Sequence, residues 1–149
     1  MKKISFDFDN TIVMSYMKYD GETPIPVFQS YNDKIIKKIK KHIKNDDDVY
    51  IVTARTRSLE KYFPEQTVDY HLEKLGLKEY FWPDKVLYTD TGPKKDILTN
   101  LGVSKHYDDS IEEHFDGLEA KYEVIQPLDK YKDSESVGKV VIFDKSGRI

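Results

Sequence analysis

The segment FDFDNTIV (residues 6–13) places two carboxylates, Asp7 and Asp9, directly after an apolar run near the start of the chain. Ile4, Phe6 and Phe8 make this run typical of a buried strand. A buried acid is costly unless it is paired, hydrogen-bonded or bound to a metal ion. The two acids therefore predict a site at the end of the first strand.

Outward from this segment, apolar runs alternate with amphipathic segments, which predicts an α/β fold. We expect a Rossmann-like three-layer sandwich around a mostly parallel sheet of about five strands, in one domain over residues 1–149. A small flap over 14–28 and a C-terminal β-hairpin over 137–149 complete the prediction. The expected strands are 2–8, 49–55, 84–90, 104–110 and 122–127, and the expected helices are 31–44, 67–77, 92–102 and 111–120.

Composition narrows the class of protein. The net charge is close to neutral at −3, so bulk charge does not indicate a polyanion binder. The chain has no cysteine, which excludes disulfides, thiol nucleophiles and cysteine metal sites. No segment approaches the ~20 apolar residues of a membrane span, and acids interrupt the first apolar run. We expect a soluble, cytoplasmic protein with no membrane association and no obligate protein partner.

Polar residues follow four of the expected strands, where α/β folds bind their ligands. Each residue alone could be a turn or a helix cap, and the two lysines could be ordinary exposed side chains. Together, however, four converging carboxylates need a cation, and oxygen ligands suit Mg²⁺. The residues are Asp7 and Asp9, Thr53, Lys94 or Lys95, and Asp108 with Asp109.

These segments resemble the four motifs of haloacid dehalogenase-like (HAD) phosphohydrolases, in the family's order. DFDNT (7–11 with its preceding strand) is similar to the DxDxT motif, and IVTAR (51–55) to the strand that ends in Thr or Ser. GPKKDIL (92–98) resembles the lysine motif, and HYDDS (106–110) the acidic pair. The resemblance covers residues 3–110, roughly three-quarters of the chain.

The resemblance implies a phosphatase that works through an aspartyl-phosphate. Asp7 would be the nucleophile, and Asp9 the general acid and base. Thr53 would hydrogen-bond a phosphoryl oxygen, and a lysine, Lys94 in preference to Lys95, would offset negative charge.

The resemblance also implies a cofactor and substrate contacts. Mg²⁺ would be held by Asp7, the backbone carbonyl of Asp9, Asp108 and Asp109. Asn10 and Thr11 would shape the turn after the strand, and the expected substrate-binding residues are Asn10, Thr11, Arg55 and Lys95. Arg55 could reach a substrate phosphate or pair with a nearby acid.

The expected flap is too short for a folded cap domain, which leaves the substrate open. The compact layout and the TAR sequence look like polynucleotide 3′-phosphatase domains and small nucleotidases, so a nucleotide or a nucleic acid end is the first expectation. The alternative is a small sugar or metabolite phosphate. A receiver-like signalling domain or a non-catalytic phosphate-binding protein is a third possibility. We assign no role to the histidines, His42, His71, His106 and His114.

Overall fold

The computed structural model describes residues 2–110, 122–125, 127 and 142–143. Its main sheet has six strands in the order β5-β4-β1-β6-β7-β8. The first five in this order are parallel, and β8 is antiparallel to β7 at the edge. The strands are β1 (Lys3–Phe6), β4 (Asp48–Thr53), β5 (Val86–Tyr88), β6 (Lys105–Tyr107), β7 (Glu123–Ile125) and β8 (Ile142–Phe143).

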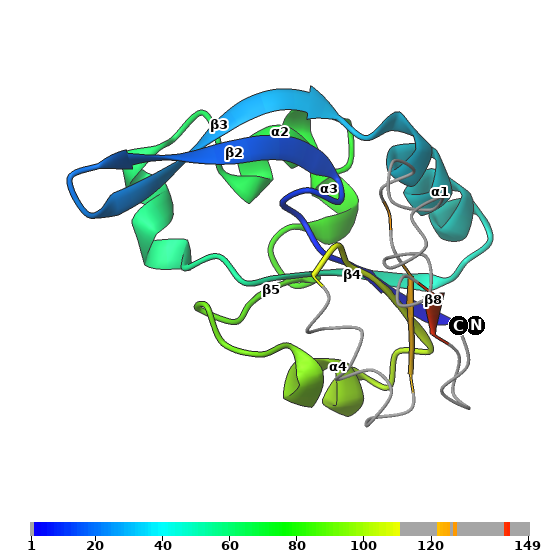
Figure 1. Cartoon of the computed structure of the whole chain (residues 1–149). Coiled ribbons are helices and arrows are strands. Elements are labelled where there is room, and N and C mark those ends of the chain that lie inside the picture. Colours follow the sequence, from blue (N-terminus) through cyan, green and yellow to red (C-terminus); the bar gives the residue numbers. More distant parts are fainter. Residues whose placement is uncertain (1, 111–121, 126, 128–141, 144–149) are drawn as a thin grey trace.

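Helices cover both faces of this sheet, so the predicted three-layer α/β fold is confirmed. In Figure 1, α4 lies on one face, and α1, α2 and α3 lie on the other together with a β-hairpin. The helices are α1 (Asp33–Lys44), α2 (Val68–Lys74), α3 (Lys78–Phe81) and α4 (Lys95–Leu101), and a 3₁₀-helix spans Arg57–Tyr62.

Strand β4 shows why the sheet needs both helical layers. Successive side chains of a strand point to opposite faces. Ile51 belongs to the apolar cluster under α1 and α2, whereas Val52 packs with Leu98 of α4. Both strand residues are fully buried, which explains the continuous apolar run in this part of the sequence.

The chain reverses its direction of winding at β1. It passes from β1 outward to β4 and β5, and then crosses through α4 to β6 on the other side of β1. Ligands of α/β folds bind at such a switch point, beyond the carboxyl ends of the strands. Here those ends belong to β1 and β6, which are followed by Asp7 and Asp108.

The predicted flap is a two-stranded antiparallel hairpin of β2 (Val13–Asp20) and β3 (Thr23–Tyr31). It is longer than the 14–28 expected, because both strands continue to the base of the flap. Pro24 and Pro26 do not prevent pairing, since a two-stranded ribbon consists of edge strands only.

Several predicted boundaries shift in the structure. The first strand ends at Phe6, not at residue 8, because the chain turns after Asp7. Helix α1 begins after Asn32, whose side chain caps it. Helix α4 begins at Lys95, so Pro93 precedes the helix and Lys94 is its N-terminal flanking residue. The expected helix over 111–120 and most of the expected hairpin over 137–149 lie outside the described residues.

The exposed side of α1 carries its lysines. Ile35, Ile36 and Ile39 are buried against the core, and the lysines of the helix are exposed. No helix among the described residues is long and apolar enough to cross a bilayer.

Candidate active site

The turn after β1 brings Asp7 and Asp9 to the rim of a cavity of about 670 Å³. The amide of Asp7 still donates to the carbonyl of Tyr107, which extends the β1–β6 ladder by one bond. The chain then reverses, with the amides of Ile12 and Val13 donating to the carbonyl of Phe8. Asn10 has a positive φ of 59°, a conformation that Asn tolerates better than most residues.

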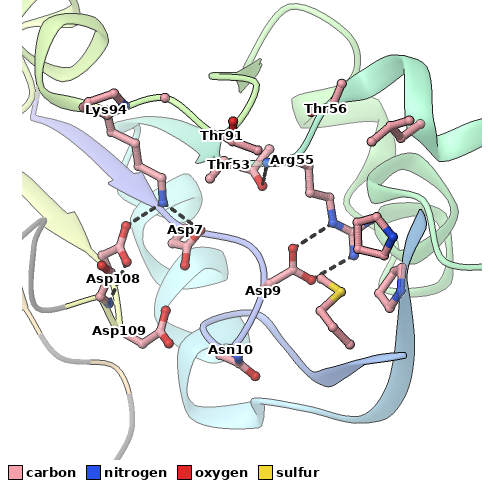
Figure 2. Close-up of a pocket in the computed structure, with 18 of the residues that line it drawn as sticks. Asp7, Asp9, Asn10, Thr53, Arg55, Thr56, Thr91, Lys94, Asp108 and Asp109 are labelled. Carbon is pink, nitrogen blue, oxygen red and sulfur yellow. Dashed lines mark hydrogen bonds and ion pairs between the residues drawn. The ribbon is translucent and has the colours of Figure 1, made fainter. Parts of the chain in front are cut away.

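Lys94 lies between the nucleophile candidate and the acidic pair, as Figure 2 shows. Its Nζ is 2.8 Å from Asp7 Oδ1 and 2.6 Å from Asp108 Oδ2. The lysine is 3% exposed, and although burial opposes its charge, the two carboxylates raise its pKa. Lys94 is therefore a fixed positive charge inside the site.

Lys95 follows Lys94 in the sequence, but its side chain does not line the cavity. It is the first residue of α4 and is absent from the residues that line the cavity. Because consecutive residues at a helix start point in different directions, only one of the two can reach Asp7. The structure places Lys94 there.

Three carboxylates form a cluster that fits a divalent cation. One oxygen from each of Asp7, Asp108 and Asp109 lies within 4.8 Å of the others. Burial and the charge of Asp108 raise the pKa of Asp7 well above its usual range, and they raise the pKa of Asp109 to about 6. Lys94 alone thus does not offset the charge of these groups, and hard oxygen ligands of this kind suit Mg²⁺.

Asp108 differs from the other two acids. Despite its burial, Lys94 and His106 lower the pKa of Asp108 below its ordinary value. Its Oδ1 also accepts a hydrogen bond of 2.9 Å from the amide of Ser110. Asp108 is accordingly the permanently charged member of the cluster.

Arg55 is held by protein groups. Its Nε and Nη2 each donate to Asp9 at 2.8 Å, and its Nη1 donates to Glu60 at 3.1 Å and to the carbonyl of Gln66 at 2.6 Å. Its guanidinium also lies over the ring of Phe8, at 4.9 Å from the centroid. Of the two roles considered from the sequence, the structure favours the ion pair.

Two of the remaining predicted residues line the cavity, and a third is buried beneath it. Thr53 and Asn10 line the cavity, and the Thr53 hydroxyl accepts from the amide of Arg55 at 3.2 Å. Thr11 does not line the cavity. It is buried behind the nucleophile, with its hydroxyl 3.4 Å from Asp7 Oδ2.

Several cavity residues were not predicted from the sequence. The hairpin supplies Met17, Pro24 and Pro26, and the 3₁₀-helix region supplies Leu59 and Phe63. No local sequence pattern places these residues in the cavity with Asp7. Together they add apolar side chains to a lining that also contains the charged residues.

A strained loop forms another part of the wall. Asp90 and Thr91 both have positive φ values, 54° and 62°. This conformation is costly for a β-branched residue and is held here by hydrogen bonds to the carbonyls of Arg55 and Ala54. Thr91 lines the cavity beside Thr53.

Comparisons with known proteins identify one sequence relative. No family model matches the chain. The uncharacterized protein L684 of Acanthamoeba polyphaga mimivirus is 32% identical over 114 residues, which is 73% of this chain. The chain spans only 22% of that relative.

Two solved structures are similar in fold. A cobalt-bound deoxy-D-mannose-octulosonate 8-phosphate phosphatase from Haemophilus influenzae has a TM-score of 0.48 and 16% identity, over 90% of this chain and 74% of that one. A Vibrio cholerae protein assigned as a 3-deoxy-D-manno-octulosonate 8-phosphate phosphatase has a TM-score of 0.45 and 15% identity, over 80% and 62%. Likenesses this distant say nothing about activity, so the residues of the site carry the functional argument.

Proposed function

We propose that this chain is a phosphomonoester hydrolase of the HAD-like type. The observation that carries the proposal is the position of Asp7. It follows the central strand, lies in the cavity, and contacts Lys94, which also contacts Asp108 of the acidic pair. A carboxylate held beside a fixed cation and a divalent-cation site is suited to attack a phosphoryl group.

In the first half of the reaction, a carboxylate oxygen of Asp7 forms a bond to phosphorus. The bond between phosphorus and the ester oxygen breaks, and the departing oxygen receives a proton from Asp9. Lys94 offsets the negative charge of the attacking carboxylate and the phosphoryl group. The hydroxyl of Thr53 donates a hydrogen bond to a phosphoryl oxygen.

In the second half, water attacks the phosphorus of the aspartyl-phosphate. Asp9 accepts a proton from this water, and the bond between Asp7 and phosphorus breaks to release inorganic phosphate. The two-point contact with Arg55 fixes the position of the Asp9 carboxylate. Proton donation by Asp9 in the first half requires that one of its oxygens be released from Arg55, since the arginine contacts both of them.

The carboxylates of Asp7, Asp108 and Asp109 would hold the divalent cation, together with the backbone carbonyl of Asp9. When bound, the cation would neutralise charge on the nucleophile and the phosphoryl oxygens and so allow them to approach. Magnesium is the expected ion because the ligands are all oxygen atoms.

We further propose that the substrate is a small phosphomonoester. The hairpin residues Met17, Pro24 and Pro26 overhang the cavity, whose volume is typical of small-molecule sites. The lysines of α1 are absent from the residues that line this cavity. These features support the small-metabolite alternative over the nucleic acid end expected first.

A substrate panel tests this choice. We expect kcat/KM to be higher for sugar phosphates than for mononucleotides or 3′-phosphorylated oligonucleotides. Preference for the oligonucleotide would show that the hairpin admits a polymer end, and it would restore the nucleic acid assignment.

The chemistry is tested with p-nitrophenyl phosphate. We expect phosphate release that requires Mg²⁺ and is abolished by Asp7→Asn. Asp33→Asn is the matched control, because it removes an exposed carboxylate on α1 without touching the cavity. Activity retained in Asp7→Asn, or activity unaffected by a chelator, would refute the mechanism.

A further inference from the structure

His106 is a buried histidine beside the acidic pair, and the reaction described above does not use it. Its side chain is fully buried. Its Nε2 lies 2.8 Å from Asp108 Oδ2, and its Nδ1 lies 2.8 Å from Ser5 Oγ. Ser5 and His106 are paired in the parallel register of β1 and β6, so the contact is part of the sheet's central layer.

The donors and acceptors of this chain of contacts can be assigned from chemistry. A carboxylate can only accept, so Nε2 must donate its hydrogen to Asp108. In the neutral ring Nδ1 then accepts, and the hydroxyl of Ser5 is the donor to it. Ser5 therefore selects the tautomer that presents an N–H to the carboxylate.

Asp108 is consequently fixed at both of its oxygens. Oδ2 accepts from Lys94 at 2.6 Å and from His106 at 2.8 Å, while Oδ1 accepts from the amide of Ser110 at 2.9 Å. Lys94 comes from the start of α4, whereas His106 and Ser110 flank Asp108 in the chain. Rotation of the carboxylate would break at least two hydrogen bonds, each expensive to lose in a buried site.

We propose that His106, supported by Ser5, is a positioning residue that holds Asp108 in the orientation needed to bind the divalent cation. This inference rests on the proposed function only in taking Asp108 as a ligand. Groups that orient metal ligands in this way typically contribute 10–100-fold to metal affinity.

The experiment measures binding of Mn²⁺ alone, without substrate, from the loss of the free-ion EPR signal. We expect His106→Leu to weaken binding by about tenfold. His106→Gln should stay close to wild type, because its amide can donate from nearly the same position. Ser5→Ala should weaken binding by less than His106→Leu, since the ring keeps its place but loses the donor that selects its tautomer.

His71→Leu is the matched control. His71 is also buried, but its partners are Tyr31 and Gln66, and it does not contact the three carboxylates. It should lower the melting temperature without changing the Kd for Mn²⁺. In the phosphatase assay, His106→Leu should raise the Mg²⁺ concentration for half-maximal activity and leave kcat at saturating Mg²⁺ within about threefold, which a general structural defect would not do.

Two outcomes would overturn the inference: wild-type affinity in His106→Leu, or equal losses in His106→Leu and His106→Gln. If His106→Leu does not fold, unchanged affinity in Ser5→Ala would overturn it instead. A wild-type protein that binds Mn²⁺ but hydrolyses no phosphomonoester would refute the proposed function and leave the positioning role of His106 standing.

Discussion

Arg55 and Asp9 form a two-point ion pair in which both nitrogen–oxygen distances are 2.8 Å. The arginine side chain is 6% exposed, and its third nitrogen contacts the buried carboxylate of Glu60. Glu60 in turn accepts hydrogen bonds from the amide of Val68 and the hydroxyl of Tyr88. The position of the proposed acid and base is thus tied to the start of α2 and to β5.

Removal of Arg55 should destabilise the fold as well as impair the reaction. Arg55→Ala leaves the carboxylate of Glu60 buried without its cation, and such a change costs about 3–5 kcal/mol. We expect this loss in the free energy of unfolding measured with urea. Arg57→Ala is the control, because Arg57 is exposed over the ring of Trp82 and should cost no more than about 1 kcal/mol.

Arg55→Lys separates charge from geometry. A lysine cannot make two parallel hydrogen bonds to Asp9, so we expect kcat to fall by at least about tenfold even if stability is partly restored. Wild-type kcat in Arg55→Lys would mean that the second hydrogen bond is dispensable for the reaction.

Lys94→Ala and Lys95→Ala distinguish the two lysines of the third motif. Lys94 contacts Asp7 and Asp108, whereas Lys95 does not line the cavity. We expect Lys94→Ala to lower kcat by about 10²–10³-fold, as for the loss of a fixed charge at a reacting group, and Lys95→Ala to change it by less than about threefold. The reverse pattern would transfer the role to Lys95.

Magnesium should stabilise the protein more at high pH than at low pH. The raised pKa values of Asp7 and Asp109 mean that the folded state binds protons more tightly than the unfolded state does. Without metal, stability should therefore fall as pH rises from about 4 through about 6. Cation binding relieves this repulsion and requires the deprotonated acids.

The measurement is the shift in melting temperature caused by Mg²⁺ at about pH 5 and at about pH 8. We expect the larger shift at the higher pH, and Asp109→Asn should reduce the difference between the two. Equal shifts at both pH values would show that these carboxylates do not couple to the ion.

His71 should contribute the opposite dependence on pH. Burial and the nearby guanidinium of Arg55 lower the pKa of His71 to about 4, from about 6.5 in the unfolded chain. Stability from the neutral ring is therefore fully present above about pH 6.5 and is lost as pH falls toward 4. The full loss is up to about 3 kcal/mol.

Urea unfolding across this pH range provides the test, with His71→Gln as the comparison. The variant should be less stable at neutral pH and should show a smaller decline on acidification. A decline of the same size in both proteins would assign it to other groups.

Much of the fold followed from the sequence because the signals are local. The apolar runs and helix periods predicted the parallel sheet, and Asn32 at the start of α1 and Gly102 after α4 mark helix ends by their own chemistry. The hairpin was predicted as a flap but not at its full length. Its two strands pair with each other, and the sequence carries no local signal for where that pairing ends.

The site divides in the same way. Asp7, Thr53 and Asp108 could be placed because each lies at the carboxyl end of a strand, and parallel strands end at one edge. The partner of Arg55 could not, because Asp9 and Glu60 meet it only in three dimensions. The contact of His106 with Asp108 had a signal, since residues two apart on a strand share a face, but its Ser5 partner is 101 residues away in sequence.

The hairpin of β2 and β3 contributes both to the lining of the cavity and to the surroundings of Asp9, the residue proposed to transfer protons. Near its base, the hydroxyl of Ser15 contacts Asp9 directly. At the end of β3, the hydroxyl of Tyr31 forms a hydrogen bond with His71. His71 in turn contacts Gln66, whose carbonyl accepts a hydrogen bond from Arg55. Its distal part, with Met17, Pro24 and Pro26, faces the cavity. One ribbon therefore carries both cavity-lining residues and a contact to Asp9, so we expect substitutions at Met17, Pro24 or Pro26 to change which phosphates are accepted while the contact of Ser15 with Asp9 is kept.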